Sequence, residues 1–135
     1  MPDTVPPSNS AMAVAASALK AQQSRMRVIA ENIANAQSTA RTAGGEPYRR
    51  QIPVFQAREV DGATGVALAE VRPDRSDFKM DYDPSHPAAN AQGYVMRPNV
   101  DTLIEAMDMR EAQRAYEANL NVIETARSMD SRTLD

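Results

Sequence analysis

Hydrophobic and polar positions follow a helical period near the N-terminus of the chain. Apolar residues recur every seven positions, and a second row follows three positions later, giving Met12, Leu19, Met26 and Ile33, then Ala15, Gln22, Ile29 and Ala36. A seven-residue repeat of this kind is typical of a coiled-coil seam, with Gln22 as its one polar member. The pattern predicts a long helix that begins near residues 8–10, where Ser and Asn are competent N-caps.

The C-terminal part of the chain also predicts a helix, with apolar residues on more than one face. Asn99 is the expected N-cap, and apolar positions begin at Val100 and Leu103. Farther along, two different faces carry Tyr116, Leu120 and Ile123, and Ala118, Val122, Ala126 and Met129. An ordinary surface helix buries a single stripe. We therefore expect this helix to have neighbours on several sides.

Glycine and proline separate these helices from a different middle region. All five glycines lie between Gly44 and Gly93. Residues 48–60 and "VALAEVR", joined by "DGATG", predict a β-hairpin, whose Pro53 indicates an edge strand. "FKMDYDP" and "GYVMRP" are weaker strand candidates. Because a two-stranded hairpin is marginal alone, it needs a third strand or packing on the helices.

The predicted fold is α+β, with long N- and C-terminal helices that pair as a coiled coil and a small β-rich hairpin module between them. We expect a flexible extension over residues 1–9, the N-terminal coiled-coil helix and linker over 10–43, the β-rich module over 44–98 and the C-terminal coiled-coil helix over 99–135. Residues 1–40 carry three basic and two acidic groups, and residues 100–135 carry four basic and eight acidic groups. This difference in charge favours pairing, within one chain or between chains.

The amino-acid composition argues against several classes of function. The formal charge of −3 argues against nucleic-acid binding, and the absence of Cys with a single His argues against thiol catalysis and a metal site. We expect no cofactor and no small-molecule substrate. The run "AMAVAASAL" resembles the apolar part of a signal peptide, but no basic residue precedes it and the helical pattern continues past any cleavage point. We therefore expect no cleaved signal peptide.

Three short motifs raise the question of catalysis or ligand binding. "DPSHP" places Ser85 beside His86, but a catalytic triad needs groups that converge from distant segments, so a rigid turn is expected. "AGGEP" lacks the Lys-Ser/Thr of a phosphate-binding loop. "YRR" is explained as a solvated strand edge. No enzyme is predicted.

The helices carry more apolar surface than the small middle region can cover, so we expect them to pack against other subunits. A contact between different patches on identical copies builds rings or open helical filaments. Asn32 and Asn35 lie three residues apart, and either bond to a neighbouring helix or form a polar exposed edge. The predicted assembly interface consists of Met12, Leu19, Met26, Ile29, Asn32, Ile33, Asn35, Leu103, Ile104, Met107, Tyr116, Ala118, Leu120, Val122, Ile123, Ala126 and Met129.

Four stretches resemble the flagellar rod and hook axial protein family. "SALKAQQSRMRVIAENIANAQST" resembles the N-terminal helix of these proteins, including the Asn-Ile-Ala-Asn step, and "RAYEANLNVIETARSM" resembles their C-terminal helix. "GGEPYRRQIPVF" and "DPSHPAANAQGYVMRPNVD" are similar to the proximal-rod member, and the second of them separates that member from the other axial proteins.

The resemblance implies a non-enzymatic structural subunit of the basal-body rod, the drive shaft that crosses the periplasm and transmits torque from motor to hook and filament. It also implies export through the flagellar type III apparatus without a cleaved signal peptide. The implied partners are other rod proteins, copies of the chain and the adapter between rod and membrane ring. The alternative is a cytosolic helical adaptor or flagellar secretion chaperone, but such a protein has no need of the "DPSHP" and "GYVMRPN" segments.

Overall fold

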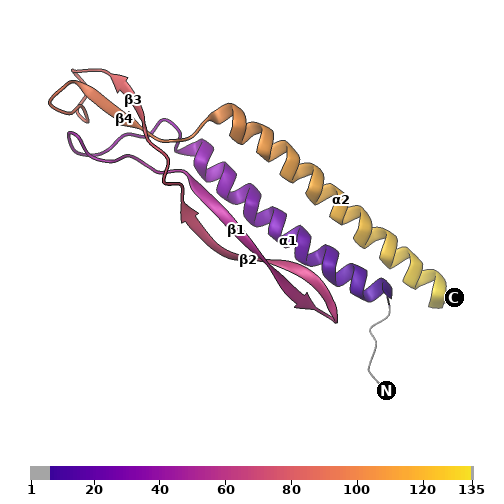
Figure 1. Ribbon diagram of the computed structural model, residues 1–135. Coiled ribbons are helices and arrows are strands. Elements are labelled where there is room, and N and C mark those ends of the chain that lie inside the picture. Colours follow the sequence, from indigo (N-terminus) through magenta and orange to yellow (C-terminus); the bar gives the residue numbers. More distant parts are fainter. Residues whose placement is uncertain (1–6, 135) are drawn as a thin grey trace. The chain divides into compact units, whose positions relative to one another are not determined.

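A computed structural model describes residues 7–134 of the chain (Figure 1). The elements in chain order are α1 (Pro7–Ala34), β1 (Gln51–Val60), β2 (Ala63–Pro73), β3 (Lys79–Tyr82), β4 (Tyr94–Arg97) and α2 (Thr102–Leu134). The predicted α+β class, with a long helix near each end and short strands between them, is confirmed. Of the predicted extension over residues 1–9, residues 1–6 lie outside the described residues, and residues 7–9 belong to α1.

The two helices begin at residues that suit a helix N-terminus. Pro7 opens α1, where its missing N–H costs no hydrogen bond. Asp101 caps α2, because its Oδ1 accepts from the backbone N–H of Leu103 at 3.0 Å and of Ile104 at 3.4 Å. The prediction that Asn99 is the N-cap was wrong. Its side-chain oxygen instead accepts from the backbone N–H of Arg50, at 2.7 Å.

Strands β1 and β2 form the predicted hairpin, a two-stranded sheet. Its turn contains Asp61 with a φ of 48° and Gly62 with a φ of 80°. Positive φ at two successive turn residues matches the right-handed twist of the strands, which is why Asp-Gly is favoured there.

Strands β3 and β4 form a second antiparallel two-stranded sheet, so both weaker candidates are confirmed. Met80 lies opposite Met96, and Tyr82 opposite Tyr94. The two tyrosine rings meet edge to face, with their centroids 5.2 Å apart. The buried residue of this pair of strands is Val95, which is fully covered.

The chain folds into two compact units, neither of which is a continuous stretch. Among the described residues, the first unit combines residues 7–27, 53–70 and 110–134, and the second combines residues 28–52 and 71–109. Each long helix contributes to both units.

In the first unit, α1 packs on one side against the β1–β2 hairpin and on another against α2, which runs antiparallel to it (Figure 1). Ser17 Oγ accepts from the backbone N–H of Val66 at 3.2 Å. A Cβ on Gly65 would lie 2.5 Å from that oxygen, so glycine allows the close approach. The expected packing of the hairpin on a helix is confirmed. The helices pack, while their coiled-coil geometry stays a prediction.

The core of the second unit is built from small side chains around two buried polar residues. Its buried residues are Val28, Ile29, Asn32, Ala36, Ala88, Gly93, Val95, Pro98, Val100 and Glu105. No aromatic ring is among them. Polar contacts therefore do much to fix how the segments of this unit pack together.

Candidate assembly surfaces

The polar centre of the second unit is Arg50, which joins the segment before β1 to the first turn of α2. Its Nε donates to Glu105 Oε1 at 2.5 Å, and its Nη1 to Asp74 Oδ2 at 3.1 Å. The Glu105 side chain is only 1% exposed. The interpretation of "YRR" as a solvated strand edge was wrong for Arg50, because its side chain is three-quarters buried in an ion-pair cluster.

The surroundings of Arg50 and Asp74 favour the charged forms of these two side chains. Burial alone would lower the pKa of Arg50, but the hydrogen bonds and charges of Glu105 and Asp74 outweigh it and raise that pKa. The pKa of Asp74 is lowered, first by the backbone N–H of Ser76 and then by the Ser76 hydroxyl and Arg50, although desolvation opposes them. Both shifts favour the charged forms. These two side chains therefore position the chain, and neither is poised for acid–base catalysis near neutral pH.

Arg49 fixes the loop that follows β2. Its Nη1 donates to the carbonyls of Asp74 and Ser76, both at 2.8 Å. The guanidinium carbon lies 4.1 Å from the centroid of the Phe78 ring, a cation–π distance. Asn99 Nδ2 donates to the same two carbonyls, at 3.1 and 3.2 Å. The two arginines of "YRR" thus organise one loop from two directions.

Asn32 bonds to its own chain. It is 1% exposed, and its Oδ1 accepts from the Tyr48 hydroxyl at 2.6 Å and from the Gln51 N–H at 2.9 Å, while its Nδ2 donates to the Gln51 carbonyl at 2.9 Å. Burial raises the pKa of Tyr48, as do Glu31 and Glu105. Asn35 follows the last residue of α1, and its side-chain Nδ2 donates to the Glu31 carbonyl in the last turn of that helix. The contact of Asn32 with the start of β1 lay outside both alternatives drawn from the sequence.

The predicted interface residues divide into three groups by their exposure in the single chain. The buried ones are Ile29, Asn32 and Ala126. The half-buried ones are Met12, Leu19, Met26, Asn35, Tyr116 and Ile123. The exposed ones are Ile33, Leu103, Ile104, Met107, Ala118, Leu120, Val122 and Met129. Most of the exposed group lies on α2, where Leu103 is 70% and Met107 is 62% exposed.

One exposed position lines a concave apolar surface of the first unit. Val122, which is 45% exposed, shares an open hollow of about 440 Å³ with Ala11 and Val14 of α1, Ala63 of the hairpin and Asn119. Exposed apolar concavities mark contact sites for other molecules. We call this feature the Val122 hollow.

In the "DPSHP" segment, the side chains of Ser85 and His86 make hydrogen bonds within two residues. Ser85 Oγ bonds to Asp83 Oδ1 at 3.2 Å, and His86 Nδ1 accepts from the Ala88 N–H at 3.0 Å. The predicted turn is confirmed by the hydrogen bond from the His86 N–H to the Asp83 carbonyl, at 3.1 Å, and neither side-chain hydrogen bond described for the turn joins Ser85 to His86. Within residues 7–134, His, Cys, Asp and Glu nowhere gather in a group of three or more that suits a metal ion. None of the helices described in that range has an apolar stretch long enough to cross a bilayer.

The sequence of the chain is similar to those of flagellar basal-body rod proteins. The family described as "Flagella basal body rod protein" matches residues 12–41, and "Flagellar basal body rod FlgEFG protein C-terminal" matches residues 91–135. The chain is 46% identical over 132 residues to flagellar basal-body rod protein FlgC of Agrobacterium fabrum, covering 96% of this chain and 94% of the relative. It is 42% identical over 123 residues to FlgC of Escherichia coli O6:H1, covering 90% and 91%. It is 38% identical over 139 residues to FlgC of Bacillus subtilis, covering 90% and 93%.

Proposed function

The chain belongs to the FlgC family of flagellar basal-body rod proteins and is a structural subunit of that rod; we propose that it builds the proximal part and helps to transmit torque from motor to hook and filament. The observation that carries the proposal is the exposed apolar surface of α2 in a chain whose relatives are rod proteins. Leu103, Met107 and Met129 are each more than half exposed. Apolar side chains of this size are covered in a finished assembly.

The proposed partners are other rod proteins, copies of the same chain and the adapter between the rod and the membrane ring. Helix α2 offers separate faces to different neighbours, because Val122 and Ile123 point about 100° apart. In the single chain Ile123 is half-buried and Val122 is exposed. One face is thus used by the chain itself, and the other is open to the next subunit.

The proposed location is the periplasmic part of the basal body, reached through the flagellar type III export apparatus without cleavage of a signal peptide. Export in an extended form suits a chain with no Cys, since no disulfide has to form before assembly. We propose no enzymatic activity. The contacts of Ser85 and His86 serve a turn, and the Arg50 guanidinium is paired with Glu105 and Asp74 of its own chain.

The test is to follow the chain in the bacterium that encodes it. The gene is deleted, the unmodified chain is restored from a plasmid, and detergent-extracted basal bodies are analysed by mass spectrometry and electron microscopy. We expect non-motile cells without rods after deletion, and rods that contain the full-length chain after restoration. The cytosolic fraction serves as the comparison. A chain found only in the cytosol, with rods still formed in the deletion strain, identifies an adaptor or secretion chaperone and overturns the proposal.

A further inference from the structure

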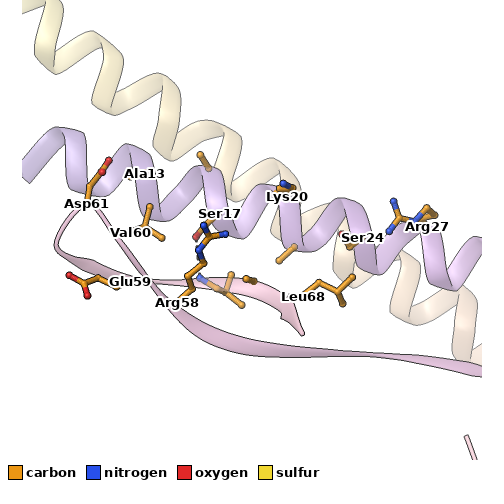
Figure 2. A pocket seen from close by; sticks show the side chains of 14 residues that line it. Ala13, Ser17, Lys20, Ser24, Arg27, Arg58, Glu59, Val60, Asp61 and Leu68 are labelled. Atoms are coloured by element: carbon orange, nitrogen blue, oxygen red, sulfur yellow. Dashed lines mark hydrogen bonds between the residues drawn. The ribbon is translucent and has the colours of Figure 1, made fainter. Parts of the chain in front are cut away.

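A groove of about 820 Å³ runs along the first unit, between one side of α1 and the β1–β2 hairpin (Figure 2). Small side chains of α1 form one wall, including Ala16, Ser17 and Ser24. Apolar residues of the hairpin, such as Val66 and Leu68, form part of the other wall. Small residues let another backbone come close, so the groove can accept a helical ridge.

Two exposed cationic side chains lie along the groove, two helical turns apart. Lys20 and Arg27 lie seven residues apart on α1, which corresponds to about 10.5 Å along the helix axis. Arg58 from the hairpin adds a third exposed cation. Within residues 7–134, none of the three makes an ion pair. Figure 2 shows Glu59 directed away from α1 and Asp61 at the far end of the groove, so the stretch from Lys20 to Arg27 is positive.

The same unit carries a matching acidic ridge on α2. Glu117 and Glu124 are exposed and also lie seven residues apart, again about 10.5 Å. Leu120 lies between them and is 38% exposed. Neither carboxylate has an ion-pair partner among the described residues. By contrast, Glu111 on the same helix already pairs with Arg25.

We propose that the groove of one copy receives the Glu117–Leu120–Glu124 ridge of a second copy. Lys20 and Arg27 then form ion pairs with the two carboxylates. Leu120 packs between these two ion pairs, against the small side chain of Ser24. The equal spacing and opposite charge are the reasons for choosing a second copy as the occupant. The inference rests on the proposed function, since it requires copies held side by side in the rod.

The geometry of this contact has a consequence for assembly. The groove and the ridge are different surfaces of the same chain, so each copy that uses its ridge keeps its groove free for the next copy. Such a heterologous contact continues as a ring or a helical filament and does not stop at a dimer. A rod of repeated subunits needs a contact of that type.

Thiol crosslinking tests the contact directly, because the chain contains no Cys. Lys20→Cys is co-expressed with Glu117→Cys or with Glu124→Cys, and isolated basal bodies are treated with a short bismaleimide. We expect a crosslinked dimer of this chain for at least one pairing, and the reactive pairing gives the direction of the ridge in the groove. The matched control replaces Lys20→Cys by Arg75→Cys, an exposed position in the second unit, and should give no dimer. No dimer with either glutamate position, or a crosslink only to a different rod protein, overturns the proposal.

Charge exchange provides an independent readout. Lys20→Glu with Arg27→Glu, and separately Glu117→Lys with Glu124→Lys, should each abolish swimming rings on soft agar, and the four changes together should restore them. The control, Arg41→Glu with Arg75→Glu, makes the same change in formal charge at exposed positions outside the groove and should swim. Failure of the fourfold variant to recover, with the unmodified chain present in basal bodies, sinks the groove proposal alone. Absence of the unmodified chain from basal bodies sinks the proposed function instead.

Discussion

The two units of this chain are stabilised in different ways. In the second unit, side chains bond across long sequence distances, as Arg50 does to Glu105 and Asn32 does to Gln51. In the first unit, two helices and a hairpin meet through small residues such as Ala15 and Ala126, and apolar groups stay open at the Val122 hollow. The second unit thus buries the charged Arg50–Glu105 pair and the Asn32 amide among contacts of its own chain. Apolar side chains stay open in both units, such as Val122 in the first and Leu103 in the second. The Val122 hollow depends on other subunits for its burial, whereas the Arg50 cluster is buried within its own unit, so damage to these two sites should appear in different measurements.

The largest effect is expected at the open surface of the first unit. Val122→Asp puts a charge into the Val122 hollow, where a neighbouring subunit would leave it buried and unpaired at a cost of several kcal/mol. We expect loss of swimming with normal protein levels and a normal circular dichroism spectrum of the dilute chain. The control Asn121→Asp adds the same charge at the adjacent exposed position and should swim. Normal swimming by Val122→Asp would show that the hollow stays open in the rod.

The next effect belongs to the second unit and concerns stability. Arg50→Ala leaves Glu105 buried without its cation, which should lower the free energy of unfolding by about 3–5 kcal/mol. Urea denaturation followed by tyrosine fluorescence reports on this unit, because it contains Tyr48, Tyr82 and Tyr94, three of the four tyrosines.

Arg75→Ala is the matched control for Arg50→Ala, since Arg75 is exposed in the same unit. It should change the unfolding free energy by no more than about 0.5 kcal/mol. Equal stability of the two variants would mean that the Arg50 cluster adds nothing to the second unit.

A smaller loss is expected at the N-terminus of α2. Asp101→Ala removes the oxygen that caps the first turn and should cost about 1 kcal/mol. Asp101→Asn keeps a capping oxygen and should cost only a few tenths of that. The same urea titration measures both variants. If the two are equally destabilised, the side-chain cap at Asp101 is not what starts this helix.

The smallest effect is the pH dependence contributed by Asp74. Because its pKa is lower in the folded chain, its stabilisation is full above the ordinary aspartate pKa of about 3.9 and is lost as the pH falls through the lowered value. Asp74→Asn should therefore be less stable than the unmodified chain near pH 6, and the difference should shrink on acidification toward about pH 3. Asp77→Asn, an exposed neighbour, serves as the control. A difference that grows with acidification contradicts the assignment.

Patterns of local sequence predicted the elements of this fold, because residues 8–43 and 99–135 contain neither Gly nor Pro and Asp61-Gly62 allows one type of tight turn. These local patterns could not predict contacts between distant segments of the chain. No residue near "YRR" indicates that Arg50 forms a hydrogen bond with the carboxylate of Glu105, 55 residues away. The heptad rows also do not tell which side the chain covers by itself: Ala15 is buried, whereas Met12 is only half-buried. The assembly interface stays a prediction for this reason, since it depends on molecules outside the chain.

The bonds of Asn32 have a consequence for how copies of the chain can meet. A side-chain amide presents its oxygen and one N–H on the same side, as the C=O and N–H of one residue in a paired strand do. Asn32 therefore stands in for a neighbouring strand beside Gln51, the first residue of β1. A strand edge with free N–H and C=O groups is a template on which another chain can add. At Gln51 that template is already occupied by the chain's own helix. Copies are thereby steered away from joining strand to strand at this point, and toward contacts made by their helices.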